Sequence, residues 1–130
     1  MFVSRSMTRK VITVDPEKSV FEAQELMAHH GIRHLPVTDA NQQLVGIVTD
    51  RDIRSALPFN FIKDSCSAEQ REQICALTVK DIMTRDPISI SPTYTIQDAL
   101  LMIQNSKVGA LPVVDEDGKL SGILSVRDLL

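Results

Sequence analysis

A repeat within the chain is the feature that most constrains its fold. Aligned with itself at an offset of 76 positions, the distance from Val3 to Val79, the 130-residue sequence matches residues 3–54 to residues 79–130 without a gap. Identical residues recur in blocks such as Met-Thr-Arg, Leu-Pro-Val and Leu-x-Gly-Ile. Because a unit of roughly 50 residues buries little core alone, we expect two repeats packed about a pseudo-two-fold axis, with ligand clefts between them.

Each repeat begins with the same local signals. Residues 11–14 and 88–90 predict short strands, each ended by a proline that disfavours helix in the residue before it. Apolar residues at helical spacing follow. Residues 19–22 form the sequence pattern of a capping box, and residues 95–98 form a weaker version. Gly31 predicts the C-terminal cap of the first helix.

The second half of each repeat predicts a hairpin and a helix. Residues 32–37 with 44–48, and residues 108–114 with 120–124, read as strand pairs separated by polar turns. A helix is expected after each pair. The predicted fold class is therefore α/β (α+β), with two pseudo-symmetric β-α-β-β-α repeats packed through their sheets.

These signals set the expected domain boundaries. Residues 1–57 form the first repeat, residues 58–78 a crossover segment, and residues 79–130 the second repeat. Good helix formers at 67–74 predict a short helix in the crossover. The final helix looks truncated at Leu130, which favours a piece trimmed from a longer protein over a short natural tail.

Composition excludes several classes of function. A formal net charge of −3, with four Phe, one Tyr and no Trp, gives neither a basic field nor stacking platforms for nucleic acid. The apolar runs are far shorter than the roughly 20 residues of a membrane span, and no signal peptide is evident, so a cytoplasmic protein without membrane contacts is expected. Cys66 and Cys75 have no metal-ligand or disulfide pattern and are interpreted as incidental thiols.

Pro36 and Pro112 lie inside predicted strands, where each costs one ladder hydrogen bond. An interrupted ladder leaves backbone amides and carbonyls available to a ligand such as the edge of a purine. A proline can equally blunt an exposed sheet edge. Both interpretations remain open at this stage.

The repeated segments 46–52 and 122–128 each end a strand with a hydroxyl residue, followed three positions later by an aspartate. A carboxylate there can accept hydrogen bonds from both ribose hydroxyls, and free amides at a helix start attract phosphate. The same spacing also satisfies a capping box, which would explain the residues without any ligand.

The doubled pattern resembles tandem cystathionine β-synthase (CBS) domains, the pair called a Bateman module, over nearly the whole chain outside the crossover. The resemblance implies a regulatory module that binds AMP, ADP, ATP or S-adenosylmethionine between the repeats and needs no obligatory cofactor. It also implies a flat homodimer and an attached or separate effector that the sequence does not identify. The chain is similar, more faintly, to acetoin-utilisation-type regulatory proteins.

The resemblance also implies ligand-binding positions. The sugar-binding carboxylate falls on Asp52 and Asp128, and the phosphate-facing hydroxyl on Thr49 and Ser125. Basic residues that reach phosphates in some members fall on Arg33 and His34, whereas the second repeat has Gly109 and Ala110, which puts equal occupancy in doubt. The positions implied for the base are Thr13, Val14, Leu35 and Pro36 in the first repeat and Ser89, Ile90, Leu111 and Pro112 in the second.

Two other classes of function are alternatives to this one. A structural homodimerisation module with degenerate, non-binding clefts remains the alternative. An enzyme is not expected, because the sequence has no Ser/His/Asp set, no Cys paired with His, no metal-spaced cluster and no phosphate loop. The sequence leaves open which adenosine ligand binds, and whether one site or two are occupied.

Overall fold

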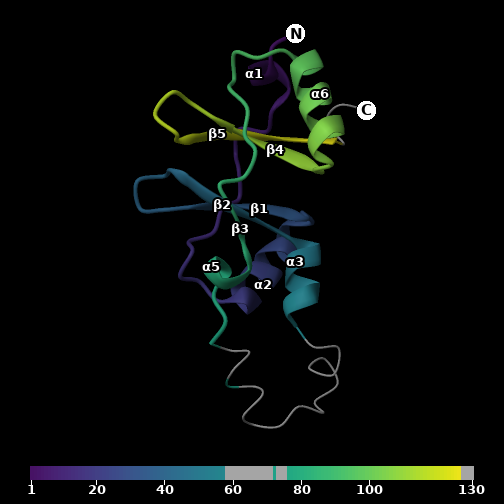
Figure 1. Cartoon of the computed structure of the whole chain (residues 1–130). Helices are drawn as coiled ribbons and strands as arrows, with labels where there is room; N and C mark the ends of the chain where they lie inside the picture. Colours follow the sequence, from purple (N-terminus) through teal and green to yellow (C-terminus); the bar gives the residue numbers. More distant parts are fainter. Residues whose placement is uncertain (58–71, 73–75, 127–130) are drawn as a thin grey trace. The chain divides into compact units, whose positions relative to one another are not determined.

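The computed structural model describes residues 1–57, 72 and 76–126 (Figure 1). Contacts divide the chain into two compact units, which do not coincide with consecutive stretches of sequence. The first unit comprises residues 12–37 and 46–85, and the second comprises residues 1–11, 38–45 and 86–130. The predicted crossover helix, apart from Glu72, and the predicted final helix lie outside the described residues, as do Cys66 and Cys75.

In the first unit, α2 (Val20–His30) begins at Ser19, whose hydroxyl accepts a hydrogen bond from the Glu22 amide at 3.1 Å. It ends at Gly31, which adopts the left-handed conformation expected of a C-terminal cap. Strands β1 (His34–Thr38), β2 (Leu44–Thr49) and β3 (Thr84–Arg85) form a sheet in the order β1-β2-β3. Helices α3 (Asp50–Ala56) and α5 (Val79–Ile82) complete the described elements of this unit.

The core of the first unit is aliphatic. One face of α2, alternate positions of the strands and one side chain each from α3 and α5 supply it, as amphipathic periodicity requires. Its buried hydrophobic residues are Val14, Val20, Ala23, Met27, Leu35, Val37, Val48, Ile53 and Val79.

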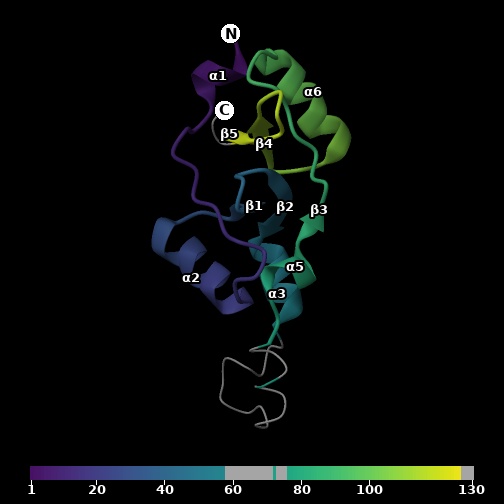
Figure 2. The same ribbon diagram turned by 90° about the vertical axis from the view of Figure 1, so that its left-hand side faces the viewer.

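In the second unit, β4 (Ala110–Val114) and β5 (Leu120–Ser125) form an antiparallel hairpin whose register pairs Leu111 with Leu124. Helix α6 (Ile96–Ser106) lies along this hairpin (Figure 2), and the short helix α1 (Val3–Ser6) completes the unit. Their shared core consists of Val3, Met7, Ile90, Ala99, Leu111, Val113 and Leu124.

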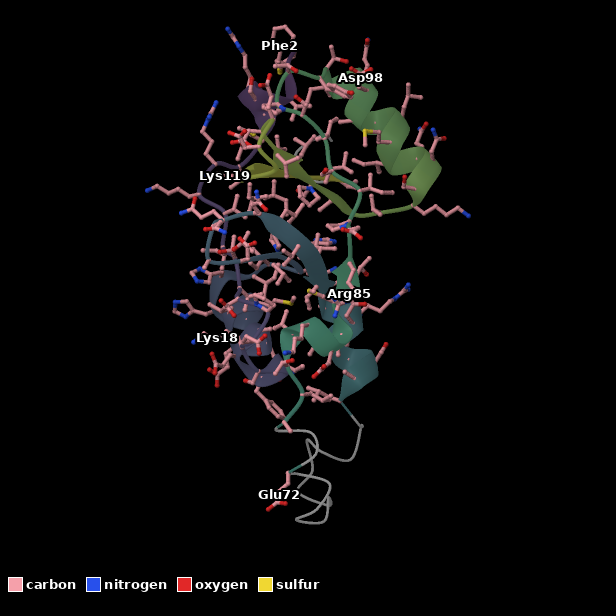
Figure 3. All side chains as sticks on the ribbon, turned by 60° about the vertical axis from the view of Figure 1, so that its left-hand side comes forward. Phe2, Lys18, Glu72, Arg85, Asp98 and Lys119 are labelled. Carbon is pink, nitrogen blue, oxygen red and sulfur yellow. The ribbon has the colours of Figure 1, made fainter. Side chains whose placement is uncertain are left out.

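The tip of the β1–β2 hairpin belongs to the second unit, where it pairs with the tip of the β4–β5 hairpin. Gln43 and Lys119 form an antiparallel bridge (Lys119 is labelled in Figure 3), and the Leu44 amide donates to the Gly118 carbonyl at 3.2 Å. The Gln43 side-chain amide also donates to the Asp117 carbonyl at 3.1 Å. The tips of the two hairpins are therefore joined by backbone hydrogen bonds.

The segment that opens each repeat packs into the unit that contains most of the other repeat. In the second unit, the Thr8 amide donates to the Ile123 carbonyl at 2.9 Å. In the first unit, the Val79 amide donates to the Lys18 carbonyl at 2.8 Å, and Arg85 pairs with Gly46. Helices α1 and α5 and strand β3 have no signal in the sequence, because segments of two to four residues carry too little periodicity.

The helices expected after residues 19 and 95, the helix expected after the first hairpin, and both hairpins are confirmed. Two local predictions were wrong. The strands predicted at 11–14 and 88–90 reduce to single parallel bridges, Val14 to Val37 and Ile90 to Val113. The relative strength of the caps is also reversed: Thr95 and Asp98 form a complete capping box, whereas at Ser19 only the hydroxyl bond to the Glu22 amide is present.

The prolines explain the short parallel pairing. In the second unit, the Ile90 amide donates to the Pro112 carbonyl at 3.0 Å, and the Val114 amide donates back to the Ile90 carbonyl at 3.0 Å. The next bond toward residue 88 would need an amide hydrogen at Pro112, which proline lacks. Pro36 stands at the matching position of the first repeat, where its carbonyl accepts from the Val14 amide at 3.1 Å.

Candidate functional site

The first repeat supplies a candidate site whose residues all lie within the first unit. They come from the segment before α2, from β1 and from the junction of β2 with α3. We call this set the first candidate site: Thr13, Val14, Arg33, His34, Leu35, Pro36, Thr49 and Asp52.

Thr49 and Asp52 are fixed by a reciprocal capping box at the start of α3. The Asp52 amide donates to Thr49 Oγ1 at 3.1 Å, and the Thr49 amide donates to Asp52 Oδ2 at 2.9 Å. Thr49 adopts an extended backbone (φ −107°, ψ 164°), which ends β2 and turns the chain into the helix. Both side chains are partly buried, so hydroxyl and carboxylate are held in one orientation before any ligand arrives.

Two of the amides at this helix start already have protein acceptors. The Asp50 amide donates to the Arg33 carbonyl at 3.0 Å, and the Asp52 amide is bonded to Thr49. The first amides of a helix have no acceptor within the helix, and these two find one elsewhere in the protein. Fewer backbone donors therefore remain for a phosphate than an uncapped helix start would offer.

A capping box alone does not identify a ligand site in this protein. Thr95 and Asp98, at the start of α6 (Asp98 is labelled in Figure 3), form the same two bonds at 3.1 and 3.0 Å. The hydrogen bonds from the Thr95 amide and side chain lower the pKa of the Asp98 carboxyl. The difference is exposure, because Asp98 is exposed while Asp52 is partly buried.

The strand residues contribute backbone rather than side chains to the candidate site. The side chains of Leu35 and Pro36 are fully buried in the first unit, and Val14 is 4% exposed. The Val14 amide is bonded to the Pro36 carbonyl, and Thr13, next to it, is exposed. Any contact of these residues with a ligand would therefore involve mainly the backbone and the Thr13 side chain.

Arg33 and His34 are the cationic residue types of the site. Arg33 is exposed, and His34 is partly buried at the start of β1. Burial lowers the pKa of His34, and this effect exceeds the opposing influence of the Asp50 carboxylate. Arg33 lowers it further, whereas Asp52 raises it. At neutral pH His34 is therefore mostly neutral, and it faces two carboxylates that would stabilise its protonated form.

The second repeat supplies a set with the same backbone frame, within the second unit. The Val126 amide donates to the Gly109 carbonyl at 3.0 Å, which matches the bond between Asp50 and Arg33 in the first site. Asp128 lies outside the described residues, so the pair that it was expected to form with Ser125 is not part of the described site. We call the described set the second candidate site: Ser89, Ile90, Ala110, Leu111, Pro112 and Ser125.

Comparison with known families identifies this doubled frame. The model of the CBS domain matches residues 3–58 and residues 79–130. The chain belongs to the CBS domain family. The two matched segments contain both candidate sites, and they leave out most of the crossover between the repeats.

Solved structures of other CBS pairs share this fold. The CBS-pair protein CBSX2 of Arabidopsis thaliana, solved in complex with AMP, is 33% identical, with a TM-score of 0.83 over 98% of this chain and 92% of that chain. The CBS domain pair of protein MJ0100, in complex with 5′-methylthioadenosine and S-adenosyl-L-methionine, is 27% identical, with a TM-score of 0.83 over 99% of this chain and 92% of that chain.

A longer enzyme contains a segment similar to this CBS pair. Inosine-5′-monophosphate dehydrogenase of Korarchaeum cryptofilum is 43% identical over 121 residues, which are 93% of this chain and 22% of that enzyme. The chain thus spans about a fifth of the length of that relative. The match covers the CBS part of the enzyme, and CBS domains are generally regulatory.

Two further findings concern the part of the CBS pair that the structure describes. Within residues 1–57, 72 and 76–126, no group of three or more His, Cys, Asp or Glu side chains is placed to hold a metal ion. Over the same residues, no helix is long and apolar enough to cross a membrane.

Proposed function

We propose that this CBS pair is a regulatory module that binds an adenosine-containing ligand and transmits its occupancy to an attached domain or a partner protein. The observation that carries the proposal is the first candidate site. There a rigid hydroxyl and carboxylate, Thr49 and Asp52, occur in one compact unit with the backbone of Val14 and Pro36. The AMP, 5′-methylthioadenosine and S-adenosyl-L-methionine complexes of the solved relatives support the ligand class.

Each part of the site has a chemical role in this proposal. The ionised Asp52 carboxylate has several lone-pair positions, of which the Thr49 amide occupies one, so it can also accept from ribose hydroxyls. The Thr49 hydroxyl keeps its hydrogen for donation to the ligand while its oxygen accepts from the Asp52 amide. Because the Val14 amide is bonded to the Pro36 carbonyl, the neighbouring backbone of Thr13 offers the polar groups that would discriminate adenine from other bases.

Regulation follows from thermodynamic linkage rather than from catalysis. A ligand that binds one conformation of the module better than another shifts the equilibrium between them by its difference in affinity. Such coupling is typically about 1–3 kcal/mol, which is sufficient to switch a partner's activity. A CBS pair that forms part of a longer enzyme in a relative supports an attached catalytic domain as one class of effector.

A second candidate function is a structural homodimerisation module with no ligand. The observation in its favour is that Thr49 and Asp52 satisfy each other as helix caps, as Thr95 and Asp98 do at an exposed helix start. In that case Asp52 and Asp98 would have the same, purely structural importance. This equivalence makes Asp98 the matched control for Asp52.

The test is a thermal-melt panel of the whole chain with AMP, ADP, ATP and S-adenosylmethionine, repeated on Asp52→Ala and Asp98→Ala. A ligand at 100 times its dissociation constant stabilises the folded state by about 2.7 kcal/mol, which is several degrees for a domain of this size. We expect both variants to lose cap stability, but only Asp52→Ala to lose the ligand-induced shift. Absence of a shift with all four ligands, in a chain that melts cooperatively, would favour the structural module.

A further inference from the structure

The two candidate sites share a backbone frame but differ in charge. The first site has Arg33 and His34, with Asp50 next to Thr49 in the chain. At the positions related by the 76-residue offset, the second repeat has Gly109, Ala110 and Val126. The frames themselves match: the Val14-to-Pro36 bond of 3.1 Å corresponds to the Ile90-to-Pro112 bond of 3.0 Å. The amides of Asp50 and Val126 each donate to the carbonyl of the residue two positions before the Leu-Pro pair.

The first site can compensate a negative charge. Arg33 is exposed and carries a permanent positive charge. His34 lies where the Asp50 and Asp52 carboxylates favour its protonated form, so an arriving phosphate would add to that effect and promote proton uptake. Asp50 itself is paired with Arg54, with Nη2 and Oδ2 3.4 Å apart, which offsets part of its repulsion of an anion.

The second site lacks this compensation among its described residues. Ala110, at the position of His34, is 5% exposed, and Val126, at the position of Asp50, is a partly buried apolar residue. Placing a phosphate against apolar side chains without a cation removes hydration that nothing there replaces. A nucleoside, whose sugar and base are uncharged, avoids that cost.

We propose that the two sites differ in ligand charge: the first takes a phosphorylated adenosine ligand, and the second takes an uncharged adenosine derivative such as a nucleoside or its thioether. This rests on the proposed function, since it requires that both sites bind adenosine compounds. Arg33 and His34 are the specificity-determining residues, and their absence from the second repeat sets its preference.

The experiment is isothermal titration of the whole chain with AMP and with 5′-methylthioadenosine, singly and in sequence. We expect one equivalent of AMP and, in the AMP-saturated chain, one further equivalent of 5′-methylthioadenosine. Arg33→Gln with His34→Ala should weaken AMP binding at least tenfold, because charge-assisted hydrogen bonds are lost, and leave the second event unchanged. Arg33→Gln alone, at an exposed residue, serves if the double variant does not fold.

Gly109→Arg is the reciprocal variant, at an exposed position of the second repeat. It should strengthen AMP binding at the second site and raise the stoichiometry of AMP toward two. Two equivalent AMP sites in the unaltered chain, or AMP affinity unchanged in the Arg33 and His34 variants, would overturn the charge assignment while leaving adenosine binding intact. Failure of both ligands to bind would instead remove the proposed function on which the assignment rests.

Discussion

Thr49 and Asp52 are joined by two hydrogen bonds that run in opposite directions, each between a side chain of one residue and the backbone amide of the other. The distances are 2.9 Å to the carboxylate and 3.1 Å to the hydroxyl. No direct bond between hydroxyl and carboxylate is needed to hold them. The start of α3 is thus preorganised by its own sequence, and a ligand that binds there does not have to order these side chains.

This geometry predicts that the two hydrogen bonds of the Thr49–Asp52 capping box contribute independently to stability. Thr49→Ala and Asp52→Ala should each cost about 1 kcal/mol of unfolding free energy, and the double variant should cost nearly the sum. Thr78 and Asp81 should behave differently, since the Thr78 hydroxyl also donates directly to Asp81 Oδ2 at 3.0 Å. Urea denaturation of the two double-mutant cycles measures this. A coupling above roughly 0.5 kcal/mol between Thr49 and Asp52 would contradict it.

Gly46 and Gly122 are required for a close backbone approach. A Cβ on Gly46 would lie 2.9 Å from the Thr84 carbonyl oxygen, and one on Gly122 would lie 2.8 Å from the Thr8 carbonyl oxygen. Because both acceptors are backbone atoms, the pairing must shift to make room. We expect Gly46→Ala and Gly122→Ala each to cost about 1–3 kcal/mol, as overpacked sites do, measured by chemical denaturation. If both variants are as stable as the parent, the neighbouring backbone can shift to admit a Cβ at little cost.

Removal of residues 1–8 should destabilise the second unit. Val3 is 0% exposed and Met7 is 9% exposed in that core, and burial of one such side chain is worth about 1.5–3 kcal/mol. Hydrogen exchange should show lost protection at the amides of Ile123 and Leu124, with Val48 of the first unit less affected. The matched control is Phe2→Ala, at a residue that is 54% exposed. Equal loss of protection in both units would argue against the division of contacts.

His34 predicts a dependence of stability on pH. Because burial lowers the pKa of His34 in the folded protein, the folded state binds this proton less readily than the unfolded state. The contribution to stability is complete above the unfolded pKa of about 6.5 and is lost as the pH falls through the lower folded pKa. The drop in melting temperature from pH 7.5 to pH 5.5 should therefore be smaller in His34→Gln than in the parent chain.

The same residue predicts the opposite trend for ligand binding. Protonated His34 should bind phosphate better, so the AMP-induced shift should grow as the pH falls in the parent chain. AMP itself titrates near pH 6, and the difference between the parent and His34→Gln removes this contribution. If the difference in AMP-induced shift between the parent and His34→Gln is the same at every pH, proton uptake by His34 is excluded.

Local signals in the sequence predicted much of this fold because they act within a few residues. The periodicity of α2 and α6, the left-handed cap at Gly31 and the two hairpins were all readable, and the 76-residue offset predicted that the repeats share one frame. Pro36 and Pro112 also indicated either an interrupted ladder or a blunted sheet edge. They did not reveal that a single bridge remains at Val14 and at Ile90, since that depends on which partner strand arrives.

The candidate site divides in the same way. The sequence by itself showed that the spacing of Thr49 and Asp52 satisfies a cap as well as a ligand site, and that Arg33 and His34 have no cationic counterparts in the second repeat. Only the tertiary structure decided that the Asp50 amide is bonded to the Arg33 carbonyl, and that the opening segment of each repeat packs into the unit containing most of the other. Such contacts join residues far apart in the chain, and no local pattern of residue types encodes which distant backbone group will be the partner.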